Sequence, residues 1–378
     1  MRSSPPGKPP FHYGWVIVFA GMLCILACLG FGRFALGMLL PSMAVTLHLS
    51  YSQMGFISTA NFLGYLASVL VSAHLAGRIG ARRLIFLALL TVAISMFLVS
   101  RATGFLPVLF LYMITGRLIP FLNRSIGPEG WRTGWRILAG LVLLVAFVAF
   151  GLLRDGPEDK GLSPVGADET APPAAPGPEM AEGNIYRKGI IYYLGAIYFL
   201  FGYTYVIFAT FIVTTLVKER GFPERVAGNF WMWVGFLSLF SGPVFGTLSD
   251  RLSRKAGLII VFALQAVSYL LIATRLPGIF LYLSIGLYGL VAWSIPSIMA
   301  AAMGDYVGAR KAATAFGLVT FIFGLGQITG PAVAGVLAEK TGSFTSSYYM
   351  AAAFAAAAIL LAVFLRKPET DPAVVQRA

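Results

Sequence analysis

Residues 246–255 read Gly-Thr-Leu-Ser-Asp-Arg-Leu-Ser-Arg-Lys, and residues 73–83 read Ala-His-Leu-Ala-Gly-Arg-Ile-Gly-Ala-Arg-Arg. Each stretch is a short basic loop that follows the second long apolar run of its half of the chain. Basic residues in short loops mark the cytoplasmic side of a membrane, so both loops are expected there. Two like halves with the same orientation predict a parallel repeat arranged around a central path.

The composition around these loops is typical of a polytopic membrane protein. Of the 378 residues, 58% are hydrophobic and 11% are charged, whereas soluble domains average about 25% charged residues. The apolar runs are roughly 18–25 residues long, which is the length of a helix that crosses a bilayer. We predict eleven membrane spans, at residues 15–40, 52–76, 83–100, 104–121, 137–153, 188–217, 228–249, 256–274, 278–301, 313–337 and 345–365.

The net charge of +13 would suggest a nucleic-acid partner in a soluble protein. Here the basic residues cluster in a few loops, where they set topology, so we expect a lipid bilayer and no nucleic acid as partner. Cys24 and Cys28 are interpreted as small apolar side chains in helix packing, because two cysteines and three histidines give too few ligands for a metal site. The chain has no phosphate-binding glycine loop, so neither ATP nor another cofactor is expected.

Residues 154–187 divide the chain into two membrane halves. They hold six prolines among acidic and small residues, a composition that cannot bury a core. We expect a cytoplasmic linker there, between an N-terminal helical bundle at 1–153 and a C-terminal helical bundle with a tail at 188–378. The basic loops predict that both termini lie in the cytoplasm. We also expect a multi-pass, monomeric protein of the plasma membrane, here a bacterial inner membrane.

The two basic loops resemble the signature loop of the major facilitator superfamily, Gly-x-x-x-Asp-Arg-x-Gly-Arg-Arg. The second copy keeps Asp250 and Arg251 but has Ser253 in place of glycine. The first copy has Gly77 in place of the aspartate. It keeps Arg78 and Gly80 of the pattern, and the arginine pair Arg82 and Arg83 follows one residue later than in the pattern. The charge contact between loop and helix that the family pattern implies therefore lacks its acid in the first half.

The sequence Gly32-Arg33-Phe34 and residues 51–65 and 316–331 resemble the YbfB-like branch of that superfamily. Residues 316–331 also resemble the related monocarboxylate and oxalate:formate carriers. The resemblance spans nearly the whole chain. It implies an all-α integral membrane protein with the major facilitator fold of two six-helix bundles, and a binding site near the membrane midplane between them.

The predicted topology is one helix short in the first half. Carriers of this family have twelve spans with both termini inside, and the second half provides six of them. The first half provides five, which would leave the linker on the outside. We therefore infer that roughly 30–40 residues are absent near Gly116-Arg117, the length of about one and a half helices and a loop. A genuine deletion variant or a re-entrant segment at 104–124 are the alternatives.

Arg33 is the leading candidate for a substrate-binding residue. It lies about midway between Trp15 and His48, in a run with no other ionisable side chain. A charge at that depth costs at least ~2.5–3.5 kcal/mol, so it should face protein, water or a ligand. A guanidinium offers a fixed fork of donors that matches a carboxylate. The alternative is that Arg33 joins helices by bonding to backbone carbonyls or a buried polar residue. By resemblance, Arg33 is the counterpart of a first-span lysine in the monocarboxylate carriers.

Other polar side chains inside predicted spans are further candidates for the substrate site. They are Asn61 and Tyr65 on one face of the second span, Tyr203 and Thr210 on one face of the span at 188–217, and Gln327. Cavity lining and interhelical hydrogen bonding are the two interpretations of such residues. By resemblance, the loop residues Arg78, Arg82, Asp250 and Arg251 would act in gating, and the alternative is that they are solvated loop charges.

These features together predict a secondary active transporter that moves a small organic anion, such as a monocarboxylate, by alternating access. Apart from Lys188 at the boundary of the span at 188–217, no aspartate, glutamate or lysine lies in a predicted span, so a proton would travel with a weak-acid substrate or through the absent segment. No constellation of nucleophile, base or metal ligands is present, and an enzyme is not expected. The alternatives are an exporter of amphipathic or drug-like compounds and a membrane sensor that does not transport.

Overall fold

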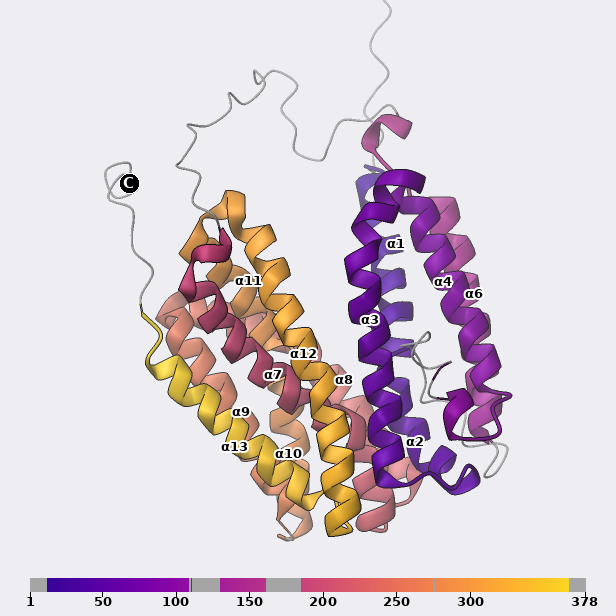
Figure 1. The fold of residues 1–378 in the computed structure, drawn as a ribbon, viewed down its shortest axis with the longest axis vertical. Helices are drawn as coiled ribbons and strands as arrows, with labels where there is room; N and C mark the ends of the chain where they lie inside the picture. The colour runs from indigo at the N-terminus through magenta and orange to yellow at the C-terminus, as the bar shows by residue number, and fades with distance from the viewer. Residues whose placement is uncertain (1–11, 109, 111–129, 161–184, 275, 367–378) are drawn as a thin grey trace, which may run out of the picture.

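The computed structural model describes residues 12–108, 110, 130–160, 185–274 and 276–366. Their regular structure is helical and forms two groups that lie side by side (Figure 1). The N-terminal group contains α1 (Gly14–Ile25), a π-helical segment η1 (Leu26–Phe31), α2 (Ala35–Thr46), α3 (Tyr51–Ile79), α4 (Ala81–Val99) and α6 (Gly130–Leu152).

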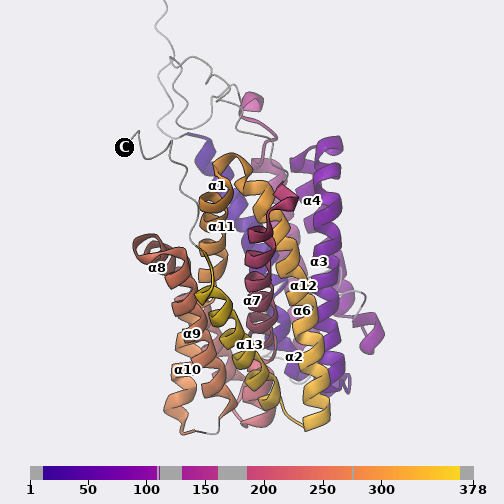
Figure 2. The ribbon, with the colours of Figure 1, turned by 60° about the vertical axis from the view of Figure 1, so that its left-hand side comes forward.

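The C-terminal group follows two short 3-10 turns, Pro157–Lys160 and Ile185–Arg187. It contains α7 (Gly189–Thr214), a π-helical segment η5 (Thr215–Glu219), α8 (Glu224–Leu252), α9 (Arg254–Ala273), α10 (Gly278–Val291), α11 (Ser294–Val307), α12 (Ala309–Thr341) and α13 (Thr345–Val363). Helix α7 lies at the centre, and every residue from 201 to 214 is buried. Helices α8, α11, α12 and α13 of this group and α2 of the other group pack against it (Figure 2).

Eight helices or joined helix pairs in the described residues are long and apolar enough to cross a membrane. The prediction of an all-α membrane protein is therefore confirmed. Helix α3 is 29 residues long, which is also enough to cross a bilayer. The predicted span at 104–121 and the inferred omission near Gly116-Arg117 lie largely outside the described residues, as does most of the linker.

The first predicted span, 15–40, differs from the structure. Its helix changes to π geometry at Leu26, loses regular structure at Gly32–Phe34, and starts again as α2, which continues to Thr46. Glycine is a poor helix former, and the two glycines Gly30 and Gly32 flank the point where the helix stops. Irregular backbone at membrane depth persists only where it is buried in protein or lines a cavity. The break therefore marks the surroundings of Arg33 as a special position.

The two groups touch closely at one end, which we call the closed end; it contains the end of α2, the start of α3 and the end of α12. A methyl group on Gly335 of α12 would lie 2.7 Å from the carbonyl oxygen of Tyr51. A methyl group on Gly37 of α2 would lie 2.8 Å from the carbonyl oxygen of Ala209 in α7. Glycine at these positions lets the helix backbones pack directly against each other.

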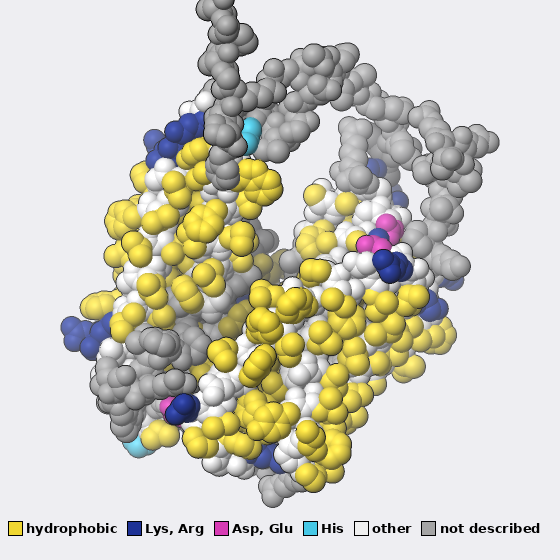
Figure 3. Space-filling model, turned by 180° about the vertical axis from the view of Figure 1, so that it is seen from behind, with side chains coloured by type: hydrophobic (Ala, Val, Ile, Leu, Met, Phe, Trp, Pro, Cys, Tyr) yellow, Lys and Arg dark blue, Asp and Glu magenta, His cyan; other side chains and the backbone are white. Residues whose placement is uncertain are grey.

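The opposite end, which contains the loops at 73–83 and 246–255, is the open end. Helices α3 and α12 diverge toward it (Figure 1), and a hollow separates the two groups there (Figure 3). Contacts of α3 with the other group come from its first sixteen residues, Tyr51 to Leu66, in the hydrogen bonds and close approaches we observe. Hydrophobic side chains cover most of the face drawn in Figure 3, as expected for a surface in contact with lipid.

Candidate functional site

Arg33 lies in the irregular turn between η1 and α2, where the two helix groups meet. Its guanidinium carbon is 4.6 Å from the ring centre of Phe62 and 4.5 Å from that of Tyr65, both on α3. Cation–π contacts of this kind stabilise a charge that has left water. The Phe62 ring is buried, whereas Tyr65 is 37% exposed. The charge is therefore held beside an accessible face of α3.

A polar chain runs from Arg33 into the C-terminal group. The Tyr205 hydroxyl of α7 interacts with Arg33, and Gln327 Nε2 of α12 donates a hydrogen bond to the same hydroxyl. Tyr205 and Gln327 are fully buried. The other amide atom, Gln327 Oε1, has no hydrogen-bond donor in the described part of the protein. The Tyr205 hydroxyl therefore links the two halves of the molecule, and Gln327 Oε1 is available as a further acceptor.

A small cavity adjoins Arg33 on the side of the closed end. Its polar lining comes from Arg33, Ser58, Asn61 and Thr210. Ser58 Oγ and Thr210 Oγ1 are 3.2 Å apart and join α3 to α7. The arrangement places a fixed cation beside several neutral hydrogen-bonding groups.

The structure brings five of the six candidate substrate residues together and leaves one out. Arg33, Asn61, Tyr65, Thr210 and Gln327 line the cavity or belong to the contacts around Arg33. Tyr203 instead points toward α13, where its hydroxyl lies 3.4 Å from the sulfur of Met350 and its ring packs against Phe354. Positions 203 and 205 lie on nearly opposite faces of α7, because each residue turns a helix by about 100°.

Several aromatic residues near Arg33 were not among the sequence candidates. Phe34 packs against Trp231 and Trp293, with ring centres 6.2 and 5.3 Å apart. Trp293 also packs against Tyr205. The only sequence signal for this cluster is that Phe34 directly follows Arg33, since the two tryptophans belong to α8 and the α10–α11 connection.

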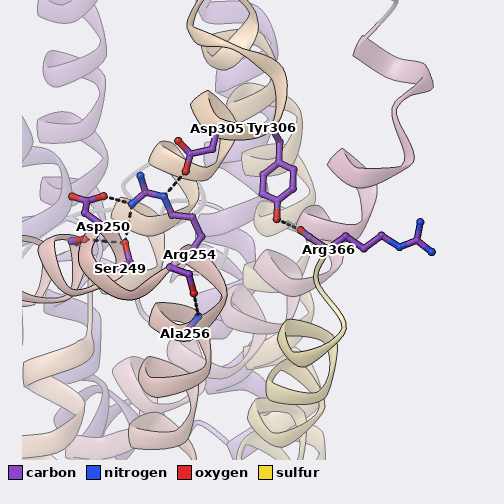
Figure 4. A network of polar contacts seen from close by, with 9 residues as sticks. Ser249, Asp250, Arg254, Ala256, Asp305, Tyr306 and Arg366 are labelled. Carbon is purple, nitrogen blue, oxygen red and sulfur yellow. Dashed lines mark hydrogen bonds and ion pairs between the residues drawn. The ribbon is translucent and has the colours of Figure 1, made fainter. Parts of the chain in front are cut away.

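The basic loops form polar contacts at the open end. Asp250 pairs with Arg254, and Arg254 Nε donates to Asp305 Oδ2 of α11 at 2.6 Å (Figure 4). The partner of Asp250 is therefore the fourth residue along and not the adjacent Arg251, which is exposed. In the first half, Arg82 Nε donates to the Phe150 carbonyl at 2.6 Å, while Arg78 is exposed.

Carboxylates join the two groups at the closed end. Ser42 of α2 donates a 2.6 Å hydrogen bond to Glu224 at the start of α8. Glu339 of α12 accepts a hydrogen bond from the Ser52 backbone amide at the start of α3, at 3.1 Å. The first amides of a helix lack partners within it, so a carboxylate is well placed there. These contacts hold the closed end shut in this conformation.

Two facing helical groups with a polar site between them, shut at one end and open at the other, define a membrane carrier. Two family models match the sequence: residues 194–378 match the model described as Major Facilitator Superfamily, and residues 25–119 match Uncharacterised MFS-type transporter YbfB. The chain belongs to the major facilitator superfamily, and the resemblance found in the sequence is confirmed.

Individual relatives differ in what they carry. Monocarboxylate transporter 2 of Homo sapiens is 24% identical over 95% of this chain and 87% of its own length. Tetracycline resistance protein, class G, of Vibrio anguillarum is 30% identical, over 33% of each protein. Multidrug resistance protein 1 of Bacillus subtilis is 27% identical over 43% of this chain and 41% of its own length.

Solved structures show the same fold. The nucleoside transporter NupG superposes with a TM-score of 0.68 at 16% identity, over 94% of this chain and 98% of that chain. A D-xylose-proton symporter superposes with a TM-score of 0.68 at 16% identity, over 94% and 97%. At these identities the likeness concerns the fold alone.

Proposed function

We propose that this major facilitator protein is a secondary active transporter of a small organic anion, with Arg33 as the binding partner of the carboxylate. The observation that carries the proposal is the position of Arg33, in a helix break at the interface of the two halves and beside a small cavity that is lined by polar and apolar side chains. A charged side chain at membrane depth is costly, and it marks a ligand or ion pathway more often than a packing contact.

The surroundings of Arg33 fit a carboxylate. A carboxylate can accept two parallel hydrogen bonds from a guanidinium. The Tyr205 hydroxyl and the side chains of Ser58, Asn61 and Thr210 add neutral groups close by. Flanking rings from Phe62 and Tyr65 restrict the guanidinium, which lowers the entropy lost when an anion binds.

Alternating access accounts for the two unlike ends. The open end carries the basic loops, so we propose that it faces the cytoplasm and that both termini lie there, in a bacterial inner membrane. The closed end would open when the contacts of Ser42 with Glu224 and of Ser52 with Glu339 separate. We further propose that the protein works as a monomer, and that a proton accompanies the anion as a weak acid.

The site also has a feature that favours an exporter of amphipathic compounds. The cluster of Phe34, Trp231 and Trp293 gives a broad aromatic wall beside Arg33, and relatives named as tetracycline or multidrug resistance proteins align with parts of this chain. An exporter of that kind would tolerate replacement of Arg33. A membrane sensor, the remaining alternative, would bind a ligand without moving it.

The decisive experiment measures uptake of labelled mono- and dicarboxylates into proteoliposomes, with and without an inward proton gradient. Three proteins are compared: wild type, Arg33→Gln and Arg101→Gln. Arg101 is an exposed arginine that stacks on Phe97, far along the chain from the site, and so controls for the loss of a positive charge.

Saturable uptake by wild type and Arg101→Gln, reduced at least tenfold in Arg33→Gln, would support the proposal; about tenfold corresponds to ~1.4 kcal/mol, within the range for one charged hydrogen bond. Equal uptake by wild type and Arg33→Gln would favour the exporter. Binding of a carboxylate without uptake would favour the sensor.

A further inference from the structure

The two repeated loops are tied to the rest of their halves by different acids. In the C-terminal half, Arg254 at the start of α9 bonds to Asp250 in the last turn of α8 and to Asp305 near the end of α11 (Figure 4). The loop copies place Gly77 where the second half has Asp250, and Ala81 where it has Arg254. Neither member of that ion pair therefore exists in the first half.

An acid from another part of the N-terminal half contacts the start of α4 instead. Asp155 lies just past the end of α6, and its Oδ1 accepts a hydrogen bond from the Arg82 backbone amide, in the first turn of α4, at 2.8 Å. The side chain of Arg82 reaches back to α6, where its Nε donates to the Phe150 carbonyl at 2.6 Å and its guanidinium lies 4.3 Å from the Phe150 ring. Residues 73 positions apart thus join α4 to α6.

The backbone is shaped for this contact. Gly80 has a φ of +83°, and a methyl group there would lie 2.9 Å from Asp155 Oδ2, so glycine allows the carboxylate to approach. The first amides of α4 have no partner within the helix, and a negative charge at that position is favourable. The Asp155 backbone amide donates to Asp159 Oδ2 at 3.2 Å, which steadies the turn that presents the carboxylate.

We infer that Asp155 is a positioning residue that replaces the missing aspartate of the first loop. It holds the first turn of α4 against the end of α6, so that the N-terminal half moves as one body when the open end closes. The inference concerns the mechanics of that half and does not depend on which solute is carried.

The test is hydrogen–deuterium exchange of the full chain in lipid nanodiscs, followed in peptides covering the first turns of α4 and α9. Asp155→Ala should speed exchange at the start of α4 by about tenfold, because a charged hydrogen bond to that turn is lost. Exchange at the start of α9 should stay unchanged. Asp250→Ala should give the reverse pattern, so that each variant is the control of the other.

A rescue experiment distinguishes the loss of the specific Asp155 contact from a general loss of stability in the N-terminal half. Adding Gly77→Asp and Ala81→Arg to Asp155→Ala transplants the ion pair of the other half, and position 77 has open space for a side chain. Exchange at α4 should return toward the wild-type rate. Asp155→Asn, which keeps an acceptor but loses the charge, should lie between wild type and Asp155→Ala, and it serves if the alanine variant does not fold. Wild-type exchange in both Asp155 variants, or fast exchange that the transplant leaves unchanged, would overturn the inference.

Discussion

Aromatic rings as well as polar atoms stabilise the charge of Arg33 away from water. Phe62 and Tyr65 come from successive turns of α3 and flank the guanidinium within 4.6 Å. The rings attract the cation through their electron-rich faces, while polar groups bond at its rim. A lysine would offer no planar fork, so the site is built for an arginine.

Replacing the accessible ring should weaken anion binding without abolishing it. Tyr65→Leu removes one of two cation–π contacts, worth about 0.5–1 kcal/mol at a partly exposed site. We expect the half-saturation concentration for the carboxylate taken up by proteoliposomes to rise about two- to fivefold. Tyr65→Phe keeps the ring and should behave as wild type; if the phenylalanine variant were impaired as much as the leucine variant, the ring would not be the important part.

The Tyr205 hydroxyl should contribute to stability because it satisfies a buried amide. Tyr205→Phe would leave Gln327 Nε2 without its observed acceptor, at a cost of about 1–3 kcal/mol. We expect a lower melting temperature in detergent solution. Adding Gln327→Leu to that variant removes the orphaned amide and should restore part of the loss. An unchanged melting temperature in Tyr205→Phe would show that the amide finds another partner.

Among the elements, the spans were the easiest to predict and the break in the first span was the hardest. Ten of the predicted spans overlap described helices because charge is confined to the loops between long apolar runs. The run from Trp15 to Leu40 is continuously apolar apart from Arg33, so hydropathy alone gave one span there. Two glycines close to Arg33 were the only sign that the helix would stop.

The sequence predicted the site residues that can be recognised by their polarity, and it did not predict those whose position depends on how the helices pack. Asn61, Tyr65 and Gln327 are polar residues in apolar helices, and their types pointed to the site. Tyr203 and Tyr205 are equally polar and two positions apart, and the choice between them depends on where α12 and α13 pack around α7. The contact of Asp155 with Arg82 joins distant parts of the chain, so no local pattern contains it.

Glycines on α12 should control whether the closed end can form. Gly335→Val would place a branched side chain against the Tyr51 carbonyl and Gly55, where the helices already touch. We expect a longer distance between spin labels at His48→Cys and Lys340→Cys, in a chain whose native cysteines are replaced by serine. Gly317→Val, on the same helix but facing open space, should leave that distance unchanged. A closed end that persists in Gly335→Val would mean that the helices can shift to admit the side chain.

For the molecule as a whole, the basic loops predict which end faces the cytoplasm. With the native cysteines replaced by serine, Arg78→Cys at the open end should react with a membrane-impermeant maleimide only in inside-out vesicles. Lys340→Cys at the closed end should react only in right-side-out cells. Both sites should react after permeabilisation, which controls for buried thiols. The opposite pattern would reverse the proposed orientation and place the linker outside.

The number of spans in the first half can be tested by the mass of the whole molecule. Its alignment with monocarboxylate transporter 2 spans 419 positions, more than the 378 residues of this chain, so that relative has residues without counterparts here. The alignment therefore supports an omission. A missing piece of about one and a half helices would bring the two halves to six spans each and put the linker on the cytoplasmic side.

We therefore expect the intact mass of the natural product to exceed 40.6 kDa by about 3–4 kDa, the mass of such a segment. A measured mass near 40.6 kDa would leave a genuine deletion or a re-entrant segment as the explanation. Tagging the linker with a fluorescent protein that matures only in the cytoplasm would then separate those two.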